Sequence, residues 1–338
     1  VFGEIIRAEG AYIHALDGFW DSYWKDPADN DKDNLHWRLK YNQENRGDVY
    51  ATHGLGPVAQ CMDIHRGDRF TTLVAMDTES FFGKDFVEKK TGKECKDFRN
   101  GDHTTTLMRT AKGKVVEIQH NVMTPQPYNR LFKLTGTKGY ATKYPTPEYA
   151  LSGDALKGTD APQMDNLNAH GFMNAAQKQA LEKKYYHPIL TKYGEKGREM
   201  GHGGMDYIMD ARLVYCLQNG LPLDMDVYDM AEWCSLAELG AISMDNNCAA
   251  VTFPDFTRGH WNKQQGYKHA YAPAEEEAKT EAAADAYTAA QKKVTADFNL
   301  WGLYDAIKTA KNPKAAQKKY DKAVEKAEKA LVKALAQK

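Results

Sequence analysis

The alternation of apolar and polar residues predicts strands in the first half of the chain. Residues 1–14, VFGEIIRAEGAYIH, have the pattern of a strand interrupted by a glycine. Residues 104–122 contain two β-rich runs around an Ala-Lys-Gly-Lys turn, and residues 130–145 repeat this arrangement around two glycines. Successive hairpins predict an antiparallel meander rather than βαβ units.

From about residue 162 onward the apolar period becomes helical. Apolar side chains between residues 205 and 216 recur at i, i+3 and i+4, and a second helix is predicted over residues 226–239, opened by acidic residues that suit its positive end. A further helix is expected to start at residues 57–62, with Pro57 in its first turn. One helical layer on an open, mostly antiparallel sheet is an α+β fold.

The C-terminal segment has a different composition. Residues 274–338 are rich in Ala, Lys and Glu, and Tyr320, Val324, Ala327, Leu331 and Leu335 fall on one helical stripe. We therefore predict two parts: a substrate-binding α+β domain over residues 1–273 and a helical extension over residues 274–338.

Composition excludes several functional classes. The 338 residues carry a formal net charge of −1, which gives no overall field to attract nucleic acid or an anionic membrane. No run of about 18 apolar residues is present, so no membrane span is predicted. The five cysteines form no Cys-x-x-Cys pair, which favours neither a disulfide framework nor a zinc site, and we predict no metal.

Familiar catalytic signatures are also missing. The sequence contains no Gly-x-Gly-x-x-Gly after a strand, no P-loop, no His-Glu-x-x-His and no Gly-x-Ser-x-Gly. Nucleotide, zinc-protease and esterase chemistry therefore has no support from motifs within this chain.

The best candidates for proton transfer are Tyr50 and His53, which come just before a Gly-x-Gly-Pro stretch expected to form a rigid turn. A purely structural role for this pair is the alternative. Residues 201–206, GHGGMD, could bind an anion or could be a tight loop in which Asp206 caps a helix. In residues 254–261, PDFTRGHW, an ion pair between Asp255 and Arg258 is expected to close the loop.

Seven collinear segments resemble one enzyme family. GEIIRAEGAYIH, HWRLKYN, YATHGLGPVAQ, GDHTTTLMRTAKGK, PQPYNRLFKLTGTKG, the run from GHGGMD to AEW, and PDFTRGHW together resemble glycoside hydrolase family 109. The resemblance extends from residue 1 to about residue 261. It implies an α/β substrate domain that follows an N-terminal Rossmann domain, so we expect the NAD-binding part to lie upstream of residue 1.

The resemblance further implies an NAD-dependent α-N-acetylgalactosaminidase, in which oxidation at C3 of the sugar permits elimination at C1, followed by water addition and re-reduction. The family's substrate-binding positions correspond to Tyr12, Arg38, Tyr50, Ala51, Thr52, His53 and Tyr128. By this correspondence His53 is the base, Tyr50 also meets the nicotinamide cofactor, and Tyr128 handles the leaving group or water. Ala51 replaces the proline expected in the family motif.

Two other functions remain open. One is a sugar oxidoreductase of the same superfamily that yields net NADH, and the other is a non-catalytic sugar-binding fragment. A glycan or glycoside is the expected partner, with homo-oligomers possible through the sheet face or the C-terminal helices. The resemblance is also compatible with export or a periplasmic location.

Overall fold

The computed structural model describes residues 1–16, 36–198 and 200–336. These residues separate into two compact units, the first formed by residues 1–195 and 225–268 and the second by residues 196–224 and 269–338. No helix among these residues is long and apolar enough to cross a membrane. The predicted domain boundary at residue 273 stays a prediction.

The first unit is built on an eight-stranded sheet with the order β7-β6-β5-β1-β4-β3-β2-β8. The strands are β1 (Ile5–Ile13), β2 (Phe70–Asp77), β3 (Thr104–Thr110), β4 (Val115–Asn121), β5 (Asn129–Gly136), β6 (Gly139–Thr142), β7 (Glu148–Leu151) and β8 (Val251–Thr252). The predicted hairpins β3–β4 and β5–β6 are confirmed. The expectation of a simple meander is wrong in one respect, because β1 lies between β4 and β5 and pairs with β4 in parallel.

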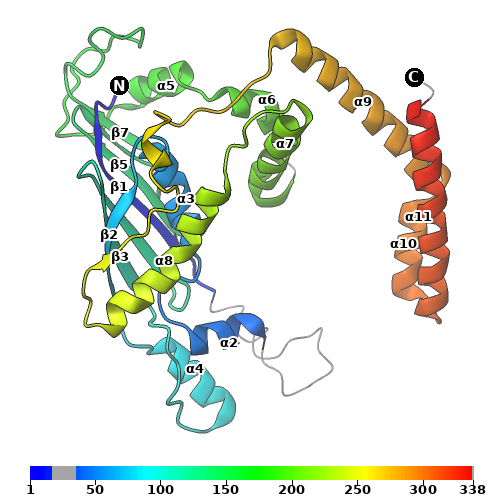
Figure 1. Cartoon of the computed structure of the whole chain (residues 1–338), viewed down its shortest axis with the longest axis horizontal. Helices are drawn as coiled ribbons and strands as arrows, with labels where there is room; N and C mark the ends of the chain where they lie inside the picture. The colour runs from blue at the N-terminus through cyan, green and yellow to red at the C-terminus, as the bar shows by residue number, and fades with distance from the viewer. Residues whose placement is uncertain (17–35, 199, 337–338) are drawn as a thin grey trace. The chain divides into compact units, whose positions relative to one another are not determined.

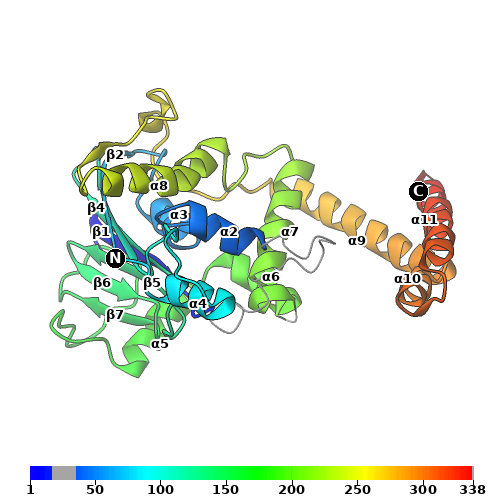
Figure 2. The same cartoon turned by 90° about the horizontal axis from the view of Figure 1, so that it is seen from below.

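The first unit has the helices α2 (Trp37–Glu44), α3 (Ala51–Cys61), α4 (Phe82–Thr91), α5 (Ala175–Lys184) and α8 (Val227–Asp245), and the short 3-10 helix η2 (His260–Asn262). α6 (Pro188–Gly197) runs across the boundary of the two units. α3 and α8 lie on one face of the sheet (Figures 1 and 2). The fold class predicted from the sequence, a mostly antiparallel open sheet with helices on one face, is confirmed.

The main hydrophobic core lies between this helical layer and the sheet. Its buried side chains come from β1 to β4, α3 and α8, and include Ala8, Leu55, Val58, Leu73, Met108, Val116, Ile118, Trp233 and Leu236. The opposite face of the sheet is polar, since Lys133 pairs with Glu9 at 3.0 Å and Arg7 pairs with both Glu9 and Glu117. Because one face of the sheet is apolar and the other is charged, a helical layer packs on the apolar face alone.

α3 begins six residues earlier than the sequence predicted. Pro57 lies inside the helix, so the expectation that Tyr50 and His53 precede a rigid turn is wrong: His53 is itself in the first helical turn. The glycines instead allow α3 and β1 to pack closely against each other. A Cβ added to Gly10 of β1 would lie 2.1 Å from the carbonyl oxygen of Gly54, so α3 can approach the strand only because both residues are glycine.

The cap of α8 shows why this helix begins where the sequence predicted. The Asp226 side chain accepts hydrogen bonds from the backbone N–H groups of Tyr228 and Asp229, while the Asp229 side chain accepts one from the backbone of Asp226. This reciprocal capping box satisfies N–H groups that a helix start leaves without partners.

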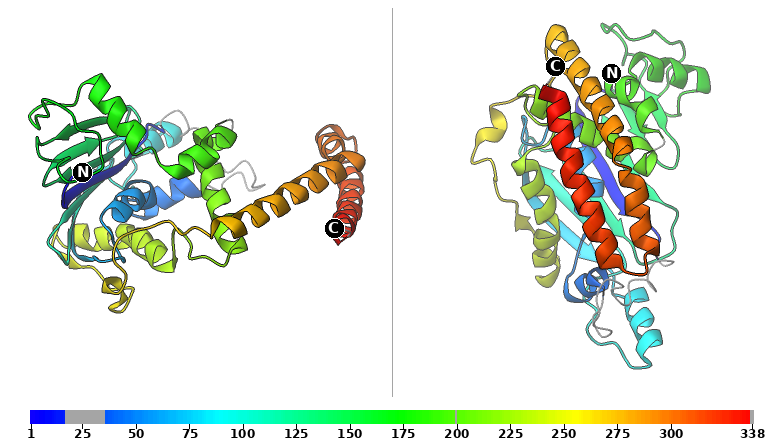
Figure 3. Two further views of the ribbon diagram at one scale, coloured as in Figure 1. Left: turned by 90° about the horizontal axis from the view of Figure 1, so that it is seen from above. Right: turned by 90° about the vertical axis from the view of Figure 1, so that its right-hand side faces the viewer.

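The second unit contains η1 (Gly201–Gly204), α7 (Met205–Gln218), α9 (Ala274–Asp297), α10 (Leu300–Thr309) and α11 (Pro313–Ala336). α10 and α11 lie side by side, and α9 also contacts α11 (Figure 3). The stripe predicted in α11 faces its neighbours, with Ala327 buried and Tyr320 in ring contact with Tyr304 at 5.8 Å. The helical extension predicted from the sequence is therefore confirmed.

Candidate active site

Three of the predicted residues meet at the end of β1. Tyr12 lies on β1, Tyr50 is the N-cap residue of α3, and His53 lies in the first turn of α3. The ring centroid of Tyr12 is 4.2 Å from that of His53 and 5.1 Å from that of Tyr50. All three side chains are half-buried, which leaves part of each ring open to a ligand.

Arg38 reaches this group from α2. Its guanidinium donates a hydrogen bond to the Tyr50 hydroxyl and lies 5.6 Å from the centroid of the same ring. A guanidinium over an aromatic face is held by both contacts at once, which fixes its orientation. Arg38 therefore lies beside the three rings.

Tyr128 joins the cluster through a residue that the sequence reasoning did not select. His14 lies 5.6 Å from Tyr12 and 5.1 Å from Tyr128, measured between ring centroids. Tyr12 and His14 are two residues apart on one extended segment, so their side chains share a face of the sheet. The two-residue spacing from Tyr12 is therefore the sequence feature that indicates His14 as a site residue. Burial, followed by the charge of Arg130, lowers the pKa of His14, so this imidazole is neutral near pH 7.

Ala51 and Thr52 occupy different environments. Ala51 is buried within the main core, whereas Thr52 is exposed on α3. The structure therefore brings together Tyr12, Arg38, Tyr50, His53 and Tyr128, and it holds Ala51 in the packing beneath them.

A second histidine, which the sequence pattern does not reveal, lies against the cluster. His120 on β4 pairs in register with Tyr12 on β1, and its ring stacks on that of Tyr50 at 5.9 Å. Burial and the neighbouring His103 and His53 lower the pKa of His120 to about 3. Within the part of the chain that the structure describes, neither ring nitrogen has a hydrogen-bond partner. Only the strand pairing reveals its position, because it is far from Tyr12 in sequence.

A buried polar network supports the loop that carries Tyr50. The side chain of Asn100 donates to that of Asn42 (2.7 Å) and accepts from the backbone N–H of Gly47 (3.0 Å). Asp48 accepts from the backbone N–H of Tyr50 at 3.1 Å, and its burial raises its pKa to about 7. Asn42 also donates to the carbonyl of Arg38 at 2.8 Å, so the network links the two segments that present Arg38 and Tyr50.

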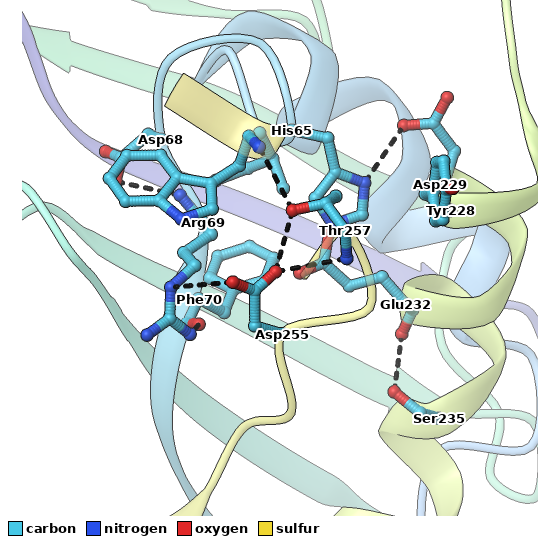
Figure 4. A network of polar contacts seen from close by, with 12 residues as sticks. His65, Asp68, Arg69, Phe70, Tyr228, Asp229, Glu232, Ser235, Asp255 and Thr257 are labelled. Atoms are coloured by element: carbon cyan, nitrogen blue, oxygen red, sulfur yellow. Dashed lines mark hydrogen bonds and ion pairs between the residues drawn. The ribbon is translucent and has the colours of Figure 1, made fainter. Parts of the chain in front are cut away.

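One cluster of the described residues has the chemistry of a metal site. Donor atoms of His65, Asp226 and Asp229 lie within 4.8 Å of one another, and Figure 4 shows His65 facing Asp229 of α8. However, Arg66 donates to both carboxylate oxygens of Asp229, at 2.8 and 2.7 Å. This bidentate pairing supplies the compensating positive charge that a cation would otherwise provide.

Two minor expectations are corrected by the contacts observed. Asp206 does not cap α7, whose N-cap is Gly204; it pairs instead with the exposed His202, at 2.8 Å. Asp255 hydrogen-bonds with Thr257 and faces Arg69 at 4.0 Å, so its cationic partner is Arg69 rather than Arg258 (Figure 4). Both motifs are held by local polar contacts.

The fold and the site together define an α+β domain with aromatic, imidazole and guanidinium groups gathered at the end of its parallel strand pair. The family model described as "Glycosyl hydrolase 109, C-terminal domain" matches residues 1–263. The chain belongs to glycoside hydrolase family 109.

Similar proteins support this membership. Glycosyl hydrolase family 109 protein 3 of Phocaeicola vulgatus is 80% identical over 338 residues, which cover 99% of this chain and 62% of that protein. Glycosyl hydrolase family 109 protein 1 of Bacteroides thetaiotaomicron is 56% identical over 273 residues, covering 80% of this chain and 56% of that protein. The chain thus spans about three fifths of the length of these relatives.

Two solved structures of low identity are similar to this chain over about three quarters of its length. Levoglucosan dehydrogenase in complex with NADH and L-sorbose is 16% identical, with a TM-score of 0.47 and coverage of 76% of this chain and 61% of the other. An oxidoreductase domain protein from Kribbella flavida is 14% identical, with a TM-score of 0.49 and coverage of 75% and 60%.

Proposed function

We propose that this chain supplies the sugar-binding part and the proton-transfer groups of an NAD-dependent glycosidase that releases terminal α-linked N-acetylgalactosamine. Membership of family 109 supports the class of reaction. The observation that carries the proposal is the placement of His53 against Tyr12 and Tyr50, with Arg38 hydrogen-bonded to Tyr50. An imidazole beside phenols and a guanidinium can move protons on a neutral sugar without a pair of carboxylates.

Each residue has a role that its position favours. His53 removes a proton from the C3 hydroxyl or from C2, because imidazole is the base whose ordinary pKa lies nearest neutrality. Burial, followed by the neighbouring Tyr50 and Tyr128, raises the pKa of Tyr12, so its phenol keeps its proton and can donate a hydrogen bond. Arg38 binds sugar hydroxyls or the acetamide carbonyl. Tyr128, exposed at the edge of the cluster, serves the leaving group or water.

The cluster is also suited to a nicotinamide ring. The half-buried rings of Tyr12, Tyr50 and His53 offer flat aromatic surface of the kind on which another planar ring packs. Bound there, NAD would supply reversible hydride transfer with the sugar, which would leave no net redox change over the whole reaction. Tyr50 is the residue proposed to meet both the cofactor and the sugar.

The test uses the full-length enzyme with p-nitrophenyl α-N-acetylgalactosaminide and no added reductant. We expect release of p-nitrophenol, reduced about 10²–10⁴-fold in His53→Ala. The matched control is His202→Ala, which removes an exposed histidine paired with Asp206 and should leave the rate unchanged. Stoichiometric NADH accumulation would favour the plain oxidoreductase instead, and full activity in His53→Ala would refute the assigned base.

A further inference from the structure

Strand β5 is distorted next to the aromatic cluster. Leu131 and Phe132 both have positive φ, at 56° and 47°, although neither is glycine. The register between β1 and β5 shifts between Glu9 and Gly10 and again between Gly10 and Ile13. Bulges and left-handed residues of this kind redirect neighbouring side chains and concentrate at binding sites.

The distortion brings two cations to the edge of the site. Arg130 precedes the bulge, and Lys143 is held to it by a backbone hydrogen bond to the carbonyl of Phe132 at 3.1 Å. The Arg130 guanidinium donates to the Tyr128 hydroxyl, while the Lys143 amine lies 5.9 Å from the Tyr144 ring. The rings of Tyr128 and Tyr144 are themselves 5.9 Å apart, so both cations border one pair of tyrosines.

Within the described residues, neither Arg130 nor Lys143 has a carboxylate partner. Among residues 1–16, 36–198 and 200–336, no carboxylate forms an ion pair with Arg130 or Lys143, whereas Lys133 on the same strand pairs with Glu9 at 3.0 Å. Burial, followed by the charge of Arg130, lowers the pKa of Lys143. Two unpaired cations held close together form a favourable site for an anion.

Space for a ligand adjoins these residues. A cavity of about 730 Å³ is lined in part by Phe132 and Lys143, together with the aromatic side chains of Tyr149, Tyr185 and Tyr186. The carboxylate of Glu182, which also lines the cavity, is engaged by the Tyr149 hydroxyl. A cavity of this size accommodates sugar units beyond the terminal residue.

We propose that Arg130 and Lys143 form an anion subsite beside the sugar site, and that it binds an acidic substituent of the glycan, such as a sulfate ester or a carboxylate. The guanidinium can engage two oxyanion oxygens at once, and the ammonium contributes a point charge. The inference rests on the proposed function only for the identity of the sugar; the subsite itself is defined by the two cations and their tyrosines.

Direct binding to the 338-residue chain tests the subsite. Isothermal titration at low salt compares N-acetylgalactosamine 6-sulfate with N-acetylgalactosamine. We expect the sulfated sugar to bind on the order of tenfold more tightly, since a hydrogen bond to a charged group contributes about that factor. Arg130→Gln and Lys143→Gln should each remove most of this preference, and Lys133→Gln, which removes a paired charge from the same strand, should retain it.

Equal affinity for the two sugars, no binding of the sulfated sugar, or a preference that survives Arg130→Gln combined with Lys143→Gln would overturn the proposal. A second arm measures NAD affinity in the full-length enzyme. If the double variant weakens NAD binding and leaves the preference for the sulfated sugar intact, the cations serve the cofactor phosphates instead. A sulfate preference in a chain whose full-length enzyme releases no N-acetylgalactosamine would refute the proposed function and leave the subsite standing.

Discussion

The buried carboxyl of Asp48 predicts a specific dependence of stability on pH. Asp48 is 3% exposed, and burial raises its pKa from 3.8 to about 7 in the folded chain. Between these two values the folded chain holds a proton that the unfolded chain has released. The free energy of unfolding therefore falls as pH rises through this window. The opposite sign would hold for a carboxyl whose pKa was lowered by folding.

The size of the expected stability change follows from the pKa shift of Asp48. The difference between 3.8 and about 7 is about 3 pKa units, and each unit corresponds to about 1.4 kcal/mol, so the ionised carboxylate costs roughly 4 kcal/mol above pH 7. Asp48→Asn removes the ionisation. It also keeps an oxygen that can accept the hydrogen bond from the Tyr50 backbone N–H. The variant should match the wild-type stability near pH 4 and exceed it by several kcal/mol near pH 8.

The measurement is urea unfolding of the 338-residue chain and its Asp48→Asn variant at intervals from pH 4 to pH 8. Because other groups titrate in both proteins, the difference between the two curves isolates Asp48. The control is Asp85→Asn, which removes an exposed carboxylate paired with Lys89 and should change stability by less than about 1 kcal/mol. Parallel curves for wild type and Asp48→Asn would refute the reasoning.

Three further substitutions test the fold around the site, each by urea denaturation. Gly10→Ala places a Cβ 2.1 Å from the Gly54 carbonyl oxygen and should cost about 1–3 kcal/mol, while Gly153→Ala, with its nearest neighbour at 3.6 Å, should cost less. Asn100→Ala removes the hydrogen-bond partner of the Asn42 side chain and that of the Gly47 backbone N–H. Each lost hydrogen bond should lower the free energy of unfolding by about 1–3 kcal/mol. Arg66→Met leaves the buried Asp229 carboxylate without its guanidinium partner and should lower the free energy of unfolding by about 3–5 kcal/mol. Adding Asp229→Asn should restore part of this stability. If any of these variants were as stable as the wild type, the role given to the substituted residue would be contradicted.

Local pattern was enough to predict much of the fold. The hairpins β3–β4 and β5–β6, the helices α7 and α8 and the stripe of α11 all follow from periodicity and capping residues. The start of α3 was missed because Gly54, Gly56 and Pro57 suggest a turn when read locally. Close contact with β1 favours the helix instead, and that contact is invisible in the linear sequence.

The candidate site also depends on tertiary contacts that the linear sequence does not reveal. Tyr12, Arg38, Tyr50, His53 and Tyr128 were selected by family resemblance, and the structure brings their side chains into one group. His120 could not be selected, since its place beneath Tyr50 depends on the parallel register of β1 and β4. The apolar face predicted for α7 is likewise not buried, with Met209 and Leu213 about half exposed, at 52% and 46%.

The proposed chemistry is tested most directly by the fate of the proton at C2 of the sugar. The full-length enzyme is allowed to turn over an α-N-acetylgalactosaminide in D₂O, and the released sugar is analysed by NMR. If His53 and its tyrosines act on a sugar oxidised at C3, the released N-acetylgalactosamine carries deuterium at C2, and His53→Ala loses this exchange together with turnover. Release at the normal rate with the original hydrogen still at C2 would contradict the account.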